Sequence, residues 1–190
     1  MEPNAASELL VTNMDNPATA ARNFDEVVQL YWQRVFRFVL ASVRDVNEAE
    51  GLTQDCFCKA YKAWNRFRGD SSVETWLMHI AVNVVRDFYR NRRLQFWRRA
   101  SVIDASEIGS ILMDRKLSPE TNAVMQEQLR SVWAATEILP TKQRTVFLLR
   151  FVDEMELSEI AQVMGITEGS VKVHLFRAVH AIRKRLGRSQ

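Results

Sequence analysis

The spacing of apolar residues between positions 73 and 88 constrains the fold of this chain more than any other feature. Apolar side chains recur at intervals of three and four: Val73, Trp76, Leu77, Ile80, Ala81, Val84, Val85 and Phe88. This spacing is typical of a helix with one buried side, whereas a half-buried strand would alternate. The opposite side of the same helix carries His79, Asn83, Arg86, Arg90 and Arg93. We therefore expect a core helix whose other side is polar, basic and directed outward.

Helical spacing also predicts the elements on either side of this helix. Apolar residues recur at helical intervals between positions 24 and 40 and again between 49 and 64. Asp45 is expected to cap the second of these helices, and Ser71 with Glu74 is expected to form a capping box for the helix that follows. No alternating apolar pattern and no Asn-Gly turn occurs anywhere. The sequence therefore predicts an all-α protein.

Composition along the chain predicts two small helical domains joined by a flexible linker. Residues 1–22 lack periodicity and are expected to be a disordered N-terminal tail, followed by a first domain over 23–99. Residues 100–122 lose both the helical period and the aromatic residues, which is typical of a linker. A second domain is expected over 123–190. A chain of 190 residues has room for two such units.

The basic residues are concentrated in two places although the whole chain is nearly neutral. The formal net charge is +3, from 26 lysines and arginines against 23 aspartates and glutamates. Residues 86–99 hold six arginines and one aspartate, and residues 172–188 hold six lysines and arginines with no acid. Two separate contacts with a polyanion such as DNA are indicated. Solvated helix surfaces are the alternative explanation, which accounts for one such run more readily than for two.

Residues 157–178 have the spacing of a helix-turn-helix unit. Ser158 is expected to cap a short helix, Gly165 to end it in a left-handed turn, and Thr167 to cap the next helix. Ala161 is small enough to let two helices cross closely. The second helix of such a unit enters the DNA major groove with its first residues on base edges. An ordinary helical hairpin shares the glycine and the caps, but it does not require the basic second helix found here.

The residue inventory provides no catalytic or metal-binding set. Cys56 and Cys58 cannot form a zinc tetrad and are expected to be small buried hydrophobic residues. The three histidines have no cysteine or carboxylate at ligand spacing, and no phosphate-binding glycine loop or GxSxG motif occurs. We expect no enzyme activity, no metal and no cofactor. No apolar run reaches the roughly 18 residues of a membrane helix and no secretory signal is evident, so a cytoplasmic protein without membrane insertion is expected.

Three segments extend these patterns into a family resemblance. They read AEGLTQDCFCKAYKAW (residues 49–64), FRGDSSVETWLMHIAVNVVRDFYRNRR (residues 67–93) and LPTKQRTVFLLRFVDEMELSEIAQVMGITEGSVKVHLFRAVHAIRKRL (residues 139–186). In combination they resemble bacterial alternative sigma factors of the extracytoplasmic-function (ECF) group, the fourth group of the sigma-70 family, over residues 24–187. The resemblance implies a region 2 helical bundle and a region 4 helix-turn-helix domain, without the extra domains of housekeeping sigma factors.

The resemblance also implies a role for each region in promoter-specific transcription initiation. Region 2 is expected to recognise and melt the −10 element: Phe67, Arg68, Gly69, Asp70 and Ser71 form the loop that captures a flipped base, Asn83 helps wall the pocket, and Arg86, Tyr89, Arg90, Arg92 and Arg93 hold phosphates. Region 4 is expected to read the −35 element with Ser170, Lys172, Val173, His174, Phe176 and Arg177. Core RNA polymerase is expected to bind through its clamp helices to Leu52, Gln54, Asp55, Phe57 and Lys59, and through its flap to the other side of region 4.

Promoter DNA, core RNA polymerase and an anti-sigma factor are thus the implied partners. A stand-alone helix-turn-helix activator is the alternative function, but it leaves the polar side of the 73–88 helix without a role. A structural helical adaptor leaves both basic runs unexplained. Val173 and His174 stand where family members often have arginine or serine, which puts the bases read there in question. Val82 stands where a basic residue is common, so one phosphate contact is expected to be missing.

Overall fold

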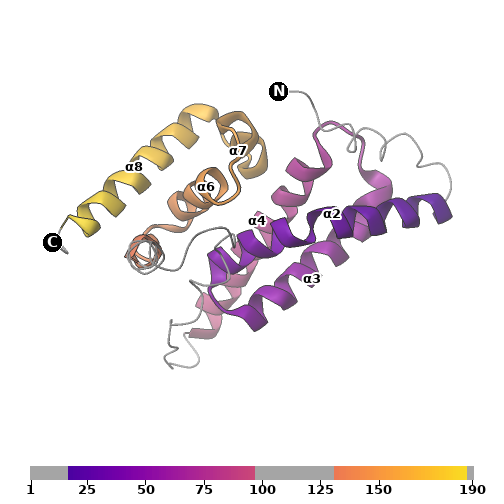
Figure 1. The fold of residues 1–190 in the computed structure, drawn as a ribbon, viewed down its shortest axis with the longest axis horizontal. Helices are drawn as coiled ribbons and strands as arrows, with labels where there is room; N and C mark the ends of the chain where they lie inside the picture. The colour runs from indigo at the N-terminus through magenta and orange to yellow at the C-terminus, as the bar shows by residue number, and fades with distance from the viewer. Residues whose placement is uncertain (1–16, 97–130, 188–190) are drawn as a thin grey trace, which may run out of the picture.

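The described part of the chain is helical, and no strand occurs in it. The computed structural model describes residues 17–96 and 131–187. The helices are α2 (Pro17–Val43), α3 (Val46–Ala63), the short 3₁₀ helix η1 (Trp64–Arg66), α4 (Val73–Phe96), a helical segment over residues 131–136, α6 (Thr141–Phe151), α7 (Leu157–Met164) and α8 (Glu168–Leu186), as Figure 1 shows. The all-α class predicted from the sequence is confirmed. None of the helices in these ranges is long and apolar enough to cross a membrane.

The described ranges bear only partly on the predicted domain boundaries. The predicted linker over 100–122 and residues 123–130 of the second domain lie outside them. Helix α2 begins at Pro17, so residues 17–22, which were assigned to the tail, belong to a helix instead. A proline is tolerated there because the first N–H groups of a helix have no intrahelical partner.

Helices α2, α3 and α4 pack together as the first helical block. The apolar stripe predicted in α4 supplies its side of this core, with Val73, Leu77 and Ala81 almost completely buried. The cap predicted at Asp45 is confirmed, because the Glu48 backbone N–H donates to Asp45 Oδ1 at 2.9 Å. Packing of an amphipathic side, more than helix propensity, stabilises such helices.

Two other caps fall on neighbours of the residues that were predicted. Helix α4 is capped by Ser72 and not by Ser71, since the Thr75 backbone N–H donates to Ser72 Oγ at 3.1 Å. Helix α7 is capped by Glu156, whose side chain takes part in a capping box, so Ser158 lies within the first turn. Serine and carboxylate side chains can both accept from the free N–H groups of a first turn. Sequence spacing therefore located both helix starts, while the choice of cap depended on the local backbone.

The second block is built from α6, α7 and α8, and α7 with α8 forms the predicted helix-turn-helix. Gly165 ends α7 with φ 62° and ψ 40°, the left-handed conformation that was expected. Thr167 caps α8, because its side chain accepts from the Ser170 backbone N–H at 3.2 Å. Val171 is completely buried and holds the start of α8 in the core of the block. These three predictions are confirmed.

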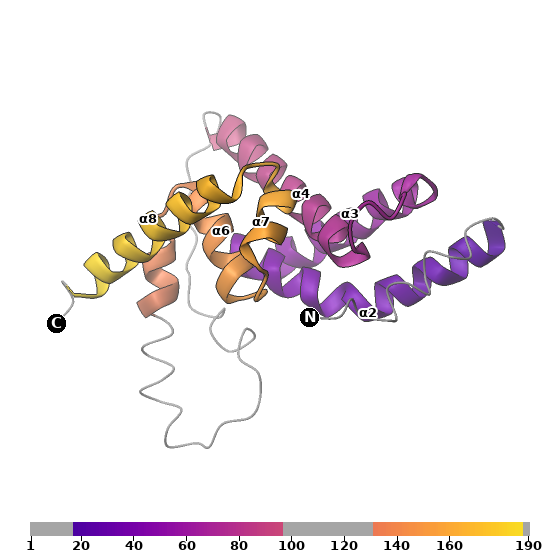
Figure 2. The same ribbon diagram turned by 90° about the horizontal axis from the view of Figure 1, so that it is seen from above.

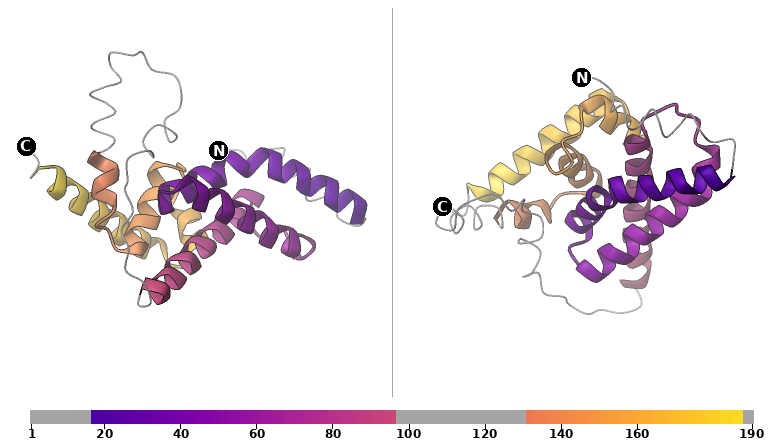
Figure 3. Two further views of the ribbon diagram at one scale, coloured as in Figure 1. Left: turned by 90° about the horizontal axis from the view of Figure 1, so that it is seen from below. Right: turned by 45° about the vertical axis from the view of Figure 1, so that its right-hand side comes forward.

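The two blocks lie against one another, which the sequence did not predict. Helix α4 packs on α7 and α2 packs on α6, as the views in Figures 2 and 3 show. Buried side chains of both blocks belong to one continuous hydrophobic cluster, which includes Val82 of α4 and Val163 of α7. The chain segments that meet are far apart in the sequence, so no local pattern announces this contact.

An arginine of α2 connects both blocks through charge. Arg34 Nε donates to Asp153 Oδ1 at 2.7 Å, and Arg34 Nη1 lies 2.6 Å from Glu74 Oε1. The Asp153 side chain, at the end of α6, is only 1% exposed. Its burial raises the pKa of the carboxyl group to about 6, against the opposing effect of the hydrogen bond from Arg34. The charges of Arg37 and Glu74 act on the same group.

We expect Gly165→Ala to lower the free energy of unfolding by about 1–2 kcal/mol. A Cβ at Gly165 would meet no atom within 4 Å, so the cost comes from the positive φ alone. Gly51→Ala is the matched control, because a Cβ at Gly51 also meets nothing and the residue lies inside α3. This control should stabilise the protein by about 0.5–1 kcal/mol. Urea denaturation of both variants measures the difference, and equal effects of the two would contradict it.

The raised pKa of Asp153 predicts that the free energy of unfolding depends on pH, and that Asp153→Asn removes this dependence. A carboxyl group with a higher pKa in the folded than in the unfolded state contributes stability at low pH, and this contribution disappears as the pH rises through about 6. The stability of the wild type relative to Asp153→Asn should therefore increase when the pH falls from 7.5 to 5. Urea denaturation of both proteins at pH 7.5 and at pH 5 measures this difference in the free energy of unfolding. A constant difference would mean that Asp153 does not titrate in this range.

Candidate nucleic-acid interface

The loop predicted to capture a flipped base connects η1 to α4. Arg68, Gly69 and Asp70 are exposed, and Gly69 has φ 76°, a left-handed conformation that favours glycine. Phe67 is different: it is 8% exposed and its ring stacks on Trp64 at a centroid distance of 5.7 Å. Its ring also lies 5.0 Å from that of Trp76. Phe67 therefore anchors the loop in the core, and the exposed polar residues after it form the accessible part.

The polar side of α4 continues from this loop along the helix. Arg86, Arg90 and Arg92 are exposed, and Asn83 is half-buried. Arg90 pairs with Asp87 one turn away at 3.3 Å, which leaves its guanidinium two-thirds exposed. The Arg93 side chain lies outside the part of the chain that the structure describes. An amide followed by exposed guanidinium groups can contact a base edge and then successive phosphates.

Tyr89 and His79 of α4 both contact the second block. The Tyr89 hydroxyl donates to the Ser42 carbonyl, and the guanidinium of Arg144 lies 5.9 Å from the centre of the Tyr89 ring. His79 Nδ1 lies 2.8 Å from the Val163 carbonyl oxygen of α7. Both side chains were predicted from the sequence to face outward. His79 is exposed, as expected, and Tyr89 is half-buried, and each of them also has a protein partner.

The face of α8 that was predicted to read the −35 element combines basic and apolar residues. Lys172 and Arg177 are exposed, Val173 is 47% exposed and Phe176 is 73% exposed. The Phe176 ring stacks on His180 at a centroid distance of 6.2 Å. Cations can contact phosphates and base edges, and apolar side chains can contact the methyl group of thymine. The predicted positions Lys172, Val173, Phe176 and Arg177 therefore share one accessible surface.

Ser170 and His174, the other predicted members of this set, are half-buried. Ser170 Oγ lies 3.0 Å from Thr167 Oγ1 and so takes part in the cap of α8. His174 Nδ1 is buried and finds no hydrogen-bond partner among the described residues.

The expected polymerase-binding residues of α3 divide into exposed and buried ones. Gln54, Asp55 and Lys59 are exposed and lie on the side of α3 that faces away from α2 and α4, whereas Leu52 is half-buried. Phe57 is 5% exposed and stacks on Trp32 at 5.3 Å, so it belongs to the core of the block. Tyr61, which was not singled out from the sequence, is 57% exposed on this helix.

The two cysteines of α3 differ from the expectation that both are buried. Cys56 is completely buried, and burial raises the pKa of its thiol to about 12. Cys58 is exposed, because two residues along a helix turn the side chain by more than half a revolution. Within the described ranges, no group of three His, Cys, Asp or Glu side chains is arranged to hold a metal ion.

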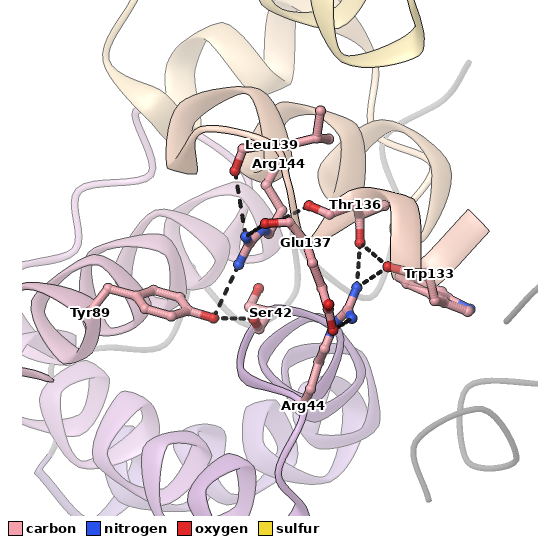
Figure 4. Close-up of polar contacts among 8 residues, drawn as sticks. All are labelled: Ser42, Arg44, Tyr89, Trp133, Thr136, Glu137, Leu139 and Arg144. Atoms are coloured by element: carbon pink, nitrogen blue, oxygen red, sulfur yellow. Dashed lines mark hydrogen bonds and ion pairs between the residues drawn. The ribbon is translucent and has the colours of Figure 1, made fainter. Parts of the chain in front are cut away.

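Sequence reasoning missed the polar residues between the two blocks, which Figure 4 shows in part. Arg44, at the turn between α2 and α3, contacts the Glu137 carboxylate, the Thr136 hydroxyl and the Trp133 carbonyl. Arg44 has φ 60°, which turns the chain sharply out of α2. Arg144 donates to the Glu137 carbonyl at 2.6 Å. No sequence pattern around Arg44 indicates that its partners lie about ninety positions further along the chain.

Comparisons with known proteins match both helical blocks to regions of one protein family. The family model for sigma-70 region 2 matches residues 27–95, and that for sigma-70 region 4 matches residues 129–182. The ECF RNA polymerase sigma factor SigW of Bacillus subtilis is 30% identical over 166 residues, covering 86% of this chain and 88% of that protein. The ECF RNA polymerase sigma-E factor of Escherichia coli is 34% identical over 167 residues, covering 84% of each chain.

A solved structure shares the fold. The sigma factor RpoE of Bartonella quintana, in complex with the anti-sigma factor NepR, superposes with a TM-score of 0.70 at 21% identity, over 87% of this chain and 98% of that one. With matches to both sigma-70 regions and relatives above 30% identity over most of its length, the chain belongs to the ECF RNA polymerase sigma factors and acts in transcription initiation.

Proposed function

We propose that region 2 of this sigma factor recognises and opens the −10 element while region 4 reads the −35 element. The observation that carries the proposal is the pair of exposed basic faces on two different helical blocks. Arg86 and Arg90 lie on one side of α4, and Lys172 and Arg177 lie on one side of α8. Neither face is needed for the core of its block.

The two faces suit two different states of DNA. A helix in the major groove can read duplex bases, which fits α8 and the −35 element. Strand opening costs a few kcal/mol per unstacked base and is recovered when bases enter pockets or stack on side chains. The exposed loop after Phe67 and, further along α4, the half-buried amide of Asn83 would receive the unstacked bases. Neither step requires a covalent catalyst, so the protein acts without enzyme activity of its own.

The proposed partners follow from the remaining surfaces. Core RNA polymerase would contact α3 through the exposed Gln54, Asp55 and Lys59. The Bartonella relative is bound by an anti-sigma factor, and we propose that a protein of this kind also restrains the present chain. Its site of action would be the cytoplasm, where the polymerase and the chromosome are. The stand-alone activator is not favoured, because it does not account for the match to region 2 over residues 27–95.

Asn83→Ala should prevent opening of the −10 element while the protein still folds and binds core polymerase. Alanine removes the donor and the acceptor that an amide presents to a base edge. The half-buried position predicts a stability loss of about 1 kcal/mol or less. Permanganate footprinting of holoenzyme on duplex promoter DNA and on a pre-melted template measures the effect. Asn91→Ala, an exposed asparagine on the same helix, is the matched control. Normal opening by Asn83→Ala would refute the pocket.

Replacing thymine by uracil in the −35 element should identify the bases that meet Val173 and Phe176. Uracil lacks only the methyl group, whose burial against an apolar side chain contributes about 0.8 kcal/mol, or roughly fourfold in affinity. Region 4 should lose this amount at one or two positions, and Val173→Ala or Phe176→Ala should abolish the difference. Phe151→Ala, another exposed phenylalanine on α6, should retain it. Binding that is insensitive to every such replacement would exclude this mode of reading.

A further inference from the structure

Phe176 of α8 has the most exposed large apolar side chain in the part of the chain that the structure describes, at 73%. The buried residues of α8 are Val171, Ala178 and Ile182, which lie on a different side of the helix. Figure 1 shows α8 at the edge of the molecule, and α6 and α7 pack against one side of it. Phe176 therefore lies on the free side and contributes nothing to the core.

The ring contact of Phe176 among the described residues is with His180, one turn further along the helix. The two ring planes are 17° apart and the ring centroids are 6.2 Å apart, which is a stacked arrangement. Four helical residues advance about 6 Å, so the rings lie one above the other along the helix axis. Side chains of a helix lean toward its N-terminus, so His180 covers the side of the Phe176 ring that is directed toward the end of α8.

Phe151, the other exposed phenylalanine among the described residues, has a different kind of partner. Its ring lies 4.7 Å from that of Phe147, a half-buried residue that packs against the hydrophobic core. Phe151 thus extends an apolar cluster. The partner of Phe176 is instead the exposed and polar His180. The stack of Phe176 on His180 therefore shapes the surface of α8 and does not stabilise the core.

The stack fixes the orientation of a side chain that would otherwise be free. An exposed phenylalanine on a helix can occupy two χ1 rotamers, because the third would strike the preceding turn. Stacking on a second ring favours one of these rotamers by about two- to tenfold. Val173, three residues earlier, shares this side of α8 and is 47% exposed. The apolar surface that Val173 and Phe176 present is thus given a defined shape before DNA binds.

We propose that His180 is a positioning residue for recognition of the −35 element. It holds the Phe176 ring in the orientation that receives the methyl group of a thymine. The inference rests on the proposed function, since it concerns the base contacts of the same helix. The residues predicted to read this element lie between positions 170 and 177 and do not include His180. Base edges are reached from the first part of a recognition helix, and His180 lies beyond it, so it acts through Phe176.

A direct contact between His180 and DNA would give a different pattern of affinities. An imidazole that touched a phosphate would contribute to binding whether or not the Phe176 ring were present. It would also contribute equally on DNA with thymine and with uracil, since phosphate contacts carry no sequence information. An effect transmitted by Phe176 disappears when the phenyl ring or the thymine methyl group is removed. A double-mutant cycle of the two residues separates these cases.

The first measurement concerns the orientation of Phe176 in the free full-length chain. Three-bond NMR couplings about χ1 report the rotamer populations in solution. Wild type should show one dominant rotamer, in up to about nine molecules in ten, and His180→Gln should bring the two rotamers close to equal. His180→Tyr, the matched variant, should keep the dominant rotamer because it retains a ring. Glutamine favours a helix at least as well as histidine, and circular dichroism checks that each variant is folded.

The second measurement concerns the affinity of holoenzyme for duplex DNA that carries the −35 element. Thymine is replaced by uracil at a position that the replacement series described above identifies. Wild type should prefer thymine by about fourfold, and His180→Gln by only about 2.5-fold, because half of its molecules would hold the Phe176 ring elsewhere. His180→Tyr should retain the fourfold preference. In a Phe176→Ala background, His180→Gln should change the affinity for neither DNA.

Three results would overturn the proposal. Unchanged rotamer populations of Phe176 in His180→Gln would mean that the stack does not orient the ring. A preference for thymine equal to that of wild type would mean that the orientation does not matter for recognition. A loss of affinity that persists in the Phe176→Ala background would mean that His180 contacts DNA itself. Failure of the proposed function has a different signature: wild-type holoenzyme would then bind the −35 duplex no more tightly than a scrambled duplex, whatever the rotamer of Phe176.

Discussion

Burial of α4 on two sides is the constraint on which the rest of this structure depends. One side supplies the core of region 2 through the stripe that begins at Val73, and another side is covered by α7 of region 4. The polar strip between them, with Arg86 and Arg90, remains exposed. A helix with two buried sides has little freedom to shift, so it holds its exposed arginines in a fixed row.

The contact between the regions is rich in groups that need partners. Asp153 is almost completely buried and is held by Arg34, which reaches it from α2 and also pairs with Glu74 of α4. Removing one member of such a pair leaves the other as an uncompensated buried charge, whereas separating the regions exposes both to water.

Region 4 exposes apolar side chains where a core would not need them. Single exposed apolar residues are common on protein surfaces, but Val173 and Phe176 lie three residues apart on the same basic helix. Lys172 and Arg177 flank them, so electrostatic attraction and apolar contact act on one surface. Phosphate contacts position such a helix without regard to sequence, and contacts to base edges and methyl groups provide the discrimination.

The sequence by itself determined the helices, the helix-turn-helix and the family, because these depend on spacings within a few turns. The stripe from Val73 to Phe88, the left-handed Gly165 and the caps at Asp45 and Thr167 are local features that residue type alone can encode. It did not determine which predicted binding residues are accessible. Phe57 and Phe67 were assigned to binding surfaces, and both rings lie in the core of region 2. Only the tertiary structure decided that His79 and Tyr89 contact the other block and that Arg34 meets Asp153. Those partners lie 55 to 119 residues away, and pairing over such separations follows from packing of whole helices, which no periodic pattern records.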